Sequence, residues 1–298
     1  MAKPSIFVDG EHGTTGLKIH ERLADRDDLA LLRIAHEDRR DASARERLLR
    51  DADIAILCLP DEASREAAAM VDGHGTRLID ASTAHRTDLD WTFGFAELTA
   101  GQKERIAGSS RVSNPGCYST GAIALLRPLT QAGVLPRDHL VTINAVSGYT
   151  GGGKSLIAEM EGPDAPVHFL YATGLAHKHV PEITRHALLT RRPIFAPAVG
   201  RFAQGMIVQV PLFCEGFTRE RLHAALADHY AGQDVVEVAP LENAERIDPT
   251  TLNGTNRMRL HVLGNDEQAL LVAVLDNLGK GASGACVQAL DLMLGAKG

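Results

Sequence analysis

Near its beginning the chain reads Ser5-Ile6-Phe7-Val8-Asp9-Gly10-Glu11-His12-Gly13-Thr14-Thr15-Gly16. The apolar run at residues 5–8 predicts a short strand, and a helical pattern follows over Leu17–Leu23. Between them, the glycines at 10, 13 and 16 form the pattern G-x-x-G-x-x-G. Glycines in a strand-to-helix turn let a pyrophosphate approach the backbone and lie on the helix N-terminus. Because the spacing differs from the usual G-x-G-x-x-G, a plain turn remains the alternative.

An alternation of strands and helices continues through the first third of the chain. Three apolar runs predict strands, namely Leu29–Ala35, Ile54–Leu59 and Arg77–Ala81, and Asp61–Val71 predicts a helix. The run at 54–59 is continuous enough to be buried on both faces, as strands of a parallel sheet are. The β-α-β-α-β order is the strongest indication of a dinucleotide-binding α/β domain.

Charged residues follow the second predicted strand, in the segment His36-Glu37-Asp38-Arg39-Arg40. At this place in a dinucleotide-binding fold, an acid binds the ribose hydroxyls of NAD and an arginine accepts the 2′-phosphate of NADP. Both types are present, so position alone leaves the choice of cofactor open. A solvated charged loop is the alternative.

Composition limits the classes of function. The 298 residues are 44% hydrophobic, which is enough for two domains with cores. The formal net charge of −7 and the 4% of aromatic residues argue against a nucleic-acid partner. No apolar run approaches the ~20 residues that span a bilayer, so we expect no membrane partner. Residues 1–5 lead directly into the first strand, so no signal peptide is expected.

The four cysteines lie far apart and show no CxxC or Cys/His ligand spacing. This pattern predicts a reducing cytoplasmic compartment and no structural metal. Cys58, Cys214 and Cys286 lie in apolar or small-residue patterns and are predicted core thiols.

Cys117 has a different setting, in Ser113-Asn114-Pro115-Gly116-Cys117-Tyr118. The Pro-Gly pair predicts a tight turn before a helix over Ser119–Leu126. Amides and the dipole at a helix start favour negative charge, so a thiol there should ionise below its free pKa of ~8.5. The side-chain amide of Asn114 could serve a developing oxyanion three residues away. A buried cysteine after a loop is the alternative.

A glycine-rich segment follows the predicted strand Leu140–Val146. Residues Gly148–Ser155 match the P-loop pattern G-x-x-x-x-G-K-[ST]. The helical run Leu156–Met160 is short, however, and no later apolar strand ends in an aspartate that would hold magnesium. We therefore favour a glycine-rich loop near the active site over a nucleotide triphosphatase loop.

Two histidines, a lysine and a glutamate lie within six residues, as His177-Lys178-His179-Val180-Pro181-Glu182. They form a candidate acid–base and anion-binding cluster. A polar loop before a helix over Glu182–Leu189 is the alternative.

The rest of the chain predicts an antiparallel sheet with helices. Residues Met206–Pro211, Met258–Leu263 and Leu270–Leu275 predict strands, and Glu220–Tyr230 predicts an amphipathic helix. The stretch from Asp276 leads into an apolar helix that ends at about residue 294. Asn277 and Lys280, near the start of this helix, could contact a ligand.

Six stretches, spread over nearly the whole chain, carry a family resemblance: Asp9–Gly16, Asn114–Tyr118, Asn144–Lys154, His177–Ile183, Phe202–Met206 and Asp276–Gly284. With them the chain resembles the N-acetyl-γ-glutamyl-phosphate reductases of arginine biosynthesis, in the short type-2 bacterial form. Aspartate-semialdehyde dehydrogenase is a relative with the same chemistry, and it shares the pattern at Asn277–Ala282. The histidine motif and the Gly151–Gly153 loop favour the acetylglutamyl enzyme.

The resemblance implies a fold and an assembly. It predicts a Rossmann-type dinucleotide-binding domain over residues 1–116 and an α+β catalytic and oligomerisation domain over 117–275. The segment 276–298 is predicted to return to the first domain as a helix. The resemblance also implies NADPH or NADP as cofactor, a small acyl-phosphate substrate, a cytoplasmic location, and a homodimer or homotetramer.

The resemblance also implies roles for residues. Cys117 would form a thioester, and a histidine would activate the thiol and later protonate the hemiacetal oxygen. We prefer His179 for this role, with His177 a close second and Glu182 as a possible orienting group. The predicted cofactor residues are Gly10, Gly13, Thr14, Thr15, Gly16, Arg39, Ser82 and Asn277. The predicted substrate residues are Asn114, Arg86 and Glu182, and no metal is expected.

Two other functions stay open at this point. One is an ATP-using enzyme or NTPase built on Gly148–Ser155, and the other is a catalytically idle dinucleotide-binding regulator.

Overall fold

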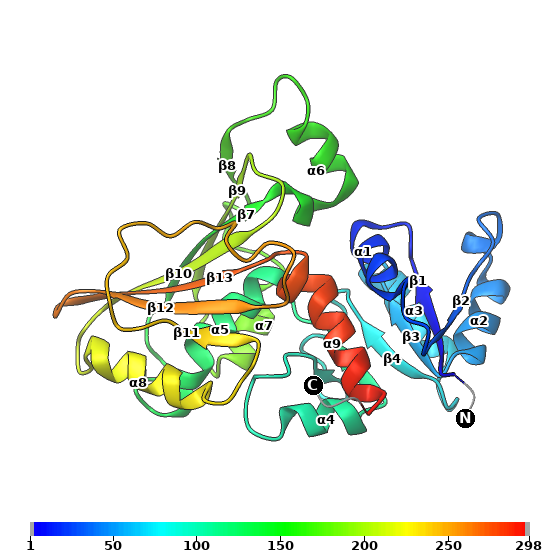
Figure 1. The fold of residues 1–298 in the computed structure, drawn as a ribbon, viewed down its shortest axis with the longest axis horizontal. Coiled ribbons are helices and arrows are strands. Elements are labelled where there is room, and N and C mark those ends of the chain that lie inside the picture. The colour runs from blue at the N-terminus through cyan, green and yellow to red at the C-terminus, as the bar shows by residue number, and fades with distance from the viewer. Residues whose placement is uncertain (1–2, 296–298) are drawn as a thin grey trace. The chain divides into compact units, whose positions relative to one another are not determined.

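The computed structural model describes residues 3–295, which form two compact units (Figure 1). The first unit contains the chain up to Ala96, then Gly101–Pro115 and the segment from Ala282 onward. The second contains Glu97–Ala100 and Gly116–Gly281. The predicted domain limits at 116/117 and 275/276 stay predictions, and residues 1–2 and 296–298 of those domains lie outside the described residues.

Within the described residues, the first unit holds a six-stranded sheet in the order β2-β1-β3-β4-β6-β5. All its pairings are parallel, so the carboxyl ends of the strands meet at one edge, where such folds bind ligands. The predicted Rossmann-type architecture is confirmed. The strands are β1 (Ser5–Asp9), β2 (Ala30–Leu32), β3 (Ile54–Leu57), β4 (Arg77–Asp80), β5 (Thr92–Phe93) and β6 (Arg111–Ser113).

Helices cover both faces of this sheet (Figure 1). Ile54 and Ile56 of β3 pack in one core with residues of α1 and α9, whereas Ala55 and Leu57 pack in the other core with residues of α2 and α3. Each large apolar side chain buried here contributes about 1.5–3 kcal/mol. The helices are α1 (Thr14–Leu23), α2 (Ala42–Asp51), α3 (Asp61–Met70), α4 (Gln102–Gly108) and α9 (Gly284–Met293).

Two elements of the first unit, β2 and α2, differ from the sequence prediction for a local reason. The strand predicted over Leu29–Ala35 is only Ala30–Leu32, because β2 is an edge strand that pairs with β1 alone and then leaves the sheet. Helix α2 was missed because its composition is highly charged. Asp41 is the N-cap residue of α2, and its carboxylate accepts hydrogen bonds from the amides of Ser43 and Ala44.

The described part of the second unit holds a seven-stranded mixed sheet in the order β11-β12-β13-β10-β7-β9-β8. β12 and β13 pair antiparallel, as do β13 and β10, which fits the predicted α+β class. The strands are β7 (Thr142–Gly148), β8 (His168–Leu170), β9 (Ile194–Gly200), β10 (Met206–Phe213), β11 (Val236–Val238), β12 (Met258–Gly264) and β13 (Gln268–Leu275).

Helix α5 (Cys117–Gln131) is the central helix of the second unit and packs on β10 and β13. A Cβ atom on Gly121 would lie 2.8 Å from the Val208 side chain, so the helix lies very close to the sheet at that point. The other helices are α6 (Gly153–Met160), α7 (Val180–His186) and α8 (Arg219–His229). Across residues 3–295, no helix combines the length and the apolar character needed to cross a membrane.

Candidate active site

Cys117 is the first residue of α5, two residues earlier than the predicted helix start. Gly116 precedes it in an extended conformation and provides no side-chain cap. Amides of the first turn and the helix dipole therefore favour an anion at this position. The thiol is partly exposed, as a nucleophile must be.

The backbone next to Cys117 has room only for glycine at one position. A Cβ atom on Gly281 would lie 2.9 Å from the Cys117 Cβ. The neighbouring Lys280 is completely buried and pairs with Glu97 over 2.6 Å. The sequence indicated that Lys280 could contact a ligand. In the structure its ammonium instead forms a buried ion pair inside the second unit.

The two histidines, His177 and His179, pack against Tyr118, the residue after Cys117. The ring of the buried Tyr118 lies 6.0 Å from the ring of His177 and 6.0 Å from that of His179, centroid to centroid. The two imidazoles lie 4.6 Å apart. The tertiary fold thus brings the two histidines against a tyrosine that lies about sixty positions earlier in the chain.

Each ring nitrogen of His177 has a neighbour. The backbone N–H of His179 donates to its Nδ1 over 3.1 Å. Its Nε2 lies 3.3 Å from the hydroxyl of Tyr171. Tyr171 was not identified from the sequence, because it is a single tyrosine before a loop and belongs to no motif.

Glu182 connects the histidine segment to the start of α5. Its carboxylate is buried and accepts from the backbone N–H of Gly116 over 3.2 Å. Helix α7 begins at Val180, two residues before the predicted start, with His179 as its N-cap residue. Glu182 therefore lies in the first turn of α7, where a negative charge is favoured.

The other three cysteines differ from Cys117 in their ionisation. Burial raises the pKa of Cys58 to about 12 and that of Cys286 well above its ordinary value. Burial, with the charge of Glu220, also raises the pKa of Cys214. These thiols are poor nucleophiles at neutral pH. Residues 3–295 hold no group of three or more His, Cys, Asp or Glu side chains placed to ligate a metal.

The first three amides of the glycine-rich segment are bound to the chain itself. The amides of Gly148, Tyr149 and Thr150 donate to the carbonyls of residues 205, 202 and 203. These amides are therefore not available to phosphate oxygens. Asn277 fixes the same loop, because its amide donates to the Thr150 hydroxyl and its oxygen accepts from the Gly205 amide.

The turn between β1 and α1 fits the pyrophosphate of a dinucleotide. Gly10 has φ +89°, and a Cβ there would lie 2.4 Å from the carbonyl oxygen of Cys58. A Cβ on Gly16 would lie 2.4 Å from the Gly10 oxygen, so only glycine lets helix α1 pack this closely. Within the described residues, the buried Thr14 hydroxyl has no hydrogen-bond partner, and Gly13 leaves the helix start without a side-chain cap. Thr15 follows in the first turn of α1.

The segment after β2 presents arginines. Arg39 is partly buried in a short 3₁₀ turn and contacts the His36 ring, 2.6 Å from Nδ1. Arg40 is exposed. Arg39 and Arg40 thus lie in the segment after β2, and dinucleotide-binding folds recognise a 2′-phosphate from this segment.

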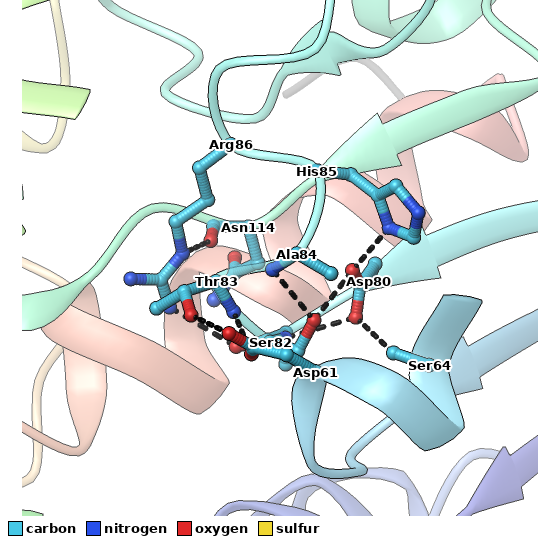
Figure 2. A network of polar contacts seen from close by, with 10 residues as sticks. Asp61, Ser64, Asp80, Ser82, Thr83, Ala84, His85, Arg86 and Asn114 are labelled. Carbon is cyan, nitrogen blue, oxygen red and sulfur yellow. Dashed lines mark hydrogen bonds and ion pairs between the residues drawn. The ribbon is translucent and has the colours of Figure 1, made fainter. Parts of the chain in front are cut away.

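Ser82 belongs to a polar network at the carboxyl end of β4 (Figure 2). The fully buried Asp80 accepts from the hydroxyls of Ser64 and Ser82, from the Ser82 amide, and lies 2.6 Å from His85 Nδ1. Burial alone would raise the pKa of Asp80, but the hydrogen bonds from His85, Ser64 and Ser82 hold it below its ordinary value. An ionised Asp80 therefore shapes the loop that carries Ser82.

Arg86 and Asn114 meet in the same region (Figure 2). The buried Arg86 donates from Nε to the Asn114 carbonyl over 2.9 Å and from Nη2 to the Ala81 carbonyl over 3.0 Å. The side-chain amide of Asn114 donates to the Ala282 carbonyl over 3.1 Å. One of the two Asn114 amide protons is thus already used within the first unit.

Two family descriptions match the chain. "Semialdehyde dehydrogenase, NAD binding domain" matches residues 33–106, and "Semialdehyde dehydrogenase, dimerisation domain" matches residues 117–277. The fold is similar to that of aspartate semialdehyde dehydrogenase II from Vibrio cholerae, with a TM-score of 0.72 and 17% sequence identity over the whole of both chains. Fold and site together define a protein of the semialdehyde dehydrogenase class.

Sequence relatives define the family more closely. N-acetyl-gamma-glutamyl-phosphate reductase of Rhizobium meliloti is 60% identical over 99% of this chain and 100% of its own. The enzyme of that name from Brucella anthropi is 59% identical over 98% and 99%. The chain belongs to the N-acetyl-γ-glutamyl-phosphate reductase family, and the resemblance predicted from the sequence is confirmed.

Proposed function

We propose that this chain reduces N-acetyl-γ-glutamyl phosphate to N-acetyl-L-glutamate 5-semialdehyde with NADPH, releasing phosphate, as a step of arginine biosynthesis. One observation carries the proposal beyond family membership. Cys117 begins helix α5, and the ring of the adjacent Tyr118 lies 6.0 Å from each of His177 and His179. A thiol at a helix start, in a segment whose next residue packs against an imidazole pair, suits covalent catalysis on an acyl group.

The first half of the reaction uses Cys117 as the nucleophile. Its thiolate attacks the carbonyl carbon of the acyl phosphate, a C–S bond forms, and the C–O bond to phosphate breaks. Phosphate leaves with the electron pair, and a thioester remains on Cys117. The covalent step divides one difficult reaction into two easier ones.

The turn at Gly10, Gly13, Thr14, Thr15 and Gly16 would hold the pyrophosphate of NADPH, and Arg39 would bind its 2′-phosphate. Bound NADPH would supply the hydride that reduces the thioester; the C–S bond then breaks, the semialdehyde leaves, and the Cys117 thiolate is regenerated. We also assign Ser82 and Asn277, each by itself, to NADPH binding. Their side chains also stabilise the loops on which they lie.

His179 is our choice for the acid–base residue. It would accept the thiol proton of Cys117 and later protonate the oxygen that develops on the reduced carbonyl. His177 is less suited, because its Nδ1 already accepts from the His179 amide and its Nε2 lies against Tyr171. Glu182 holds the turn before Cys117 through Gly116.

Substrate binding and assembly complete the proposal. Arg86, Asn114 and Glu182 are assigned to the substrate, Arg86 because its positive charge suits a carboxylate or phosphate. We also propose a cytoplasmic homodimer or homotetramer formed through the second unit, which matches a dimerisation domain. Three large apolar side chains of its sheet are exposed, Leu170 by 61%, Ile194 by 49% and Phe213 by 66%.

A reverse-direction assay tests the proposed function. Purified protein is mixed with the semialdehyde, phosphate and NADP, and NADPH formation is followed by absorbance. Phosphate-dependent NADPH formation supports the reductase. A parallel ATP-hydrolysis assay with the Lys154→Ala variant tests the NTPase alternative, and nucleotide binding without turnover in either assay would favour the idle regulator.

A further inference from the structure

Tyr171 is the residue in the site that no sequence motif identifies. It follows the edge strand β8, and its amide donates to the Pro197 carbonyl over 3.3 Å. Its ring lies 5.5 Å from that of His177 at 69°. Its hydroxyl lies 3.3 Å from His177 Nε2.

The loop that joins these two residues has an unusual backbone. Ala172 has φ +50° and Leu175 has φ +56°, and the Leu175 amide donates to the Ala172 carbonyl over 2.9 Å. Across residues 3–295, Leu188 is the one other non-glycine residue with positive φ. Side chains rarely adopt this conformation, and such residues concentrate at functional sites. The loop folds back so that Tyr171 and His177 meet.

The backbone contact of His177 determines which of its nitrogens carries the proton, because the Tyr171 hydroxyl could either donate or accept. A backbone N–H can only donate, so Nδ1, which accepts from His179, holds a lone pair. A neutral His177 then carries its proton on Nε2, which points to the Tyr171 oxygen. With Nε2 protonated and Nδ1 occupied, this ring has no free position for the thiol proton.

We propose that Tyr171 is a positioning residue: its hydroxyl accepts the Nε2 proton that the His179 amide contact fixes on His177, orients that ring, and so leaves acid–base chemistry to His179. This inference rests on the proposed function for its catalytic meaning, but the tautomer itself is a property of the free protein. Burial raises the pKa of Tyr171 to about 12, so its hydroxyl stays protonated at neutral pH and can accept from His177 without forming an ion pair.

Burial raises the pKa of both Tyr171 and Tyr118, and the charge of a Cys117 thiolate raises both further. Tyr118 donates to the Ala198 carbonyl over 2.9 Å. Tyr171, whose hydroxyl also interacts with that of Tyr118, is the tyrosine whose hydroxyl contacts His177.

The test compares Tyr171→Phe with Tyr149→Phe. The first change removes only the hydroxyl at His177, and the second removes an exposed hydroxyl whose bond to Glu161 is 3.4 Å long. Histidine is labelled with ¹⁵N, and the His177 signals are assigned by their loss in His177→Gln. The wild type should show a pyrrole-type Nε2 and a pyridine-type Nδ1, Tyr171→Phe should keep this tautomer but show a shifted Nε2–H signal that exchanges faster with water, and Tyr149→Phe should match the wild type.

Kinetics form the second arm of the test. Loss of one neutral hydrogen bond should lower kcat in Tyr171→Phe roughly 2- to 12-fold with little change in NADPH affinity. A wild-type proton on Nδ1, an unchanged Nε2–H signal in Tyr171→Phe, or an unchanged kcat in that variant each overturns the inference. If the wild type does not turn over the acyl phosphate at all, the proposed function fails, and the tautomer spectra alone then decide the structural claim.

Discussion

The backbone amide of Gly116 donates to the Glu182 carboxylate over 3.2 Å, so the turn before Cys117 is held by a residue sixty-six positions away. Replacing Glu182 with Ala leaves a buried amide without its acceptor, which costs about 1–3 kcal/mol. Glu182→Gln keeps a carbonyl oxygen and should lose less. Urea unfolding measures the stability, and thioester formation measures the position of Cys117. Equal stability of the Ala variant and the wild type would contradict the role of this contact.

The close approach of Gly281 to Cys117 gives a second prediction. Gly281→Ala places a methyl group 2.9 Å from the Cys117 Cβ and 3.1 Å from the Asp276 carbonyl oxygen, so the thiol must shift. We expect kcat to fall at least tenfold, since a displacement of ~1 Å at a reacting group costs about 10²-fold. Gly108→Ala, which has open space around its Cβ, is the matched control. Wild-type kcat in Gly281→Ala would show that this contact does not position the thiol.

Cofactor choice depends on Arg39. A charge-assisted bond to phosphate contributes roughly 1.5–3 kcal/mol. Arg39→Ala should therefore weaken NADPH about ten- to hundredfold and leave NADH nearly unchanged, as measured by fluorescence titration. Arg40→Ala is the comparison, because Arg40 is exposed. An equal loss for both cofactors would rule out a 2′-phosphate contact.

Alkaline pH should destabilise the protein through its buried thiols. The folded-state pKa of Cys58 is raised to about 12, so above its ordinary pKa the unfolded chain loses this proton and the folded chain keeps it. Stability is present below about pH 8.5 and falls between there and pH 12, by up to about 1.4 kcal/mol per pH unit for this thiol. Cys58→Ala should flatten that slope in urea unfolding between pH 9 and 11. An unchanged slope would contradict the assignment.

Alkylation should separate the four cysteines. Cys117 starts a helix, whereas burial raises the pKa of Cys58, Cys214 and Cys286. Iodoacetamide near neutral pH should therefore label Cys117 first, and acyl phosphate should protect it. Peptide mass spectrometry after short exposure reads the order. Faster labelling of the partly exposed Cys214 would contradict the expected reactivity.

Local patterns were sufficient for much of the fold and for the helix start near which the proposed nucleophile lies. The turn at Gly10 and the helix start at Cys117 depend on residues adjacent in the chain, so sequence could predict them. Lys280 could not be placed in this way, because its partner Glu97 is 183 positions away. Likewise, Tyr171 contacts His177 only because the loop between them takes a rare conformation. The order of the second sheet depends on long-range pairing for the same reason.

The covalent role of Cys117 is the central claim, and a mass measurement tests it most directly. Wild-type protein and Cys117→Ala are each incubated with N-acetyl-γ-glutamyl phosphate without NADPH, quenched in acid and analysed as intact protein and as peptides. The wild type should gain one N-acetylglutamyl group on the peptide that contains Cys117, and the variant should gain none while still binding NADPH. An adduct on another residue, or substantial turnover by Cys117→Ala, would contradict the thioester mechanism.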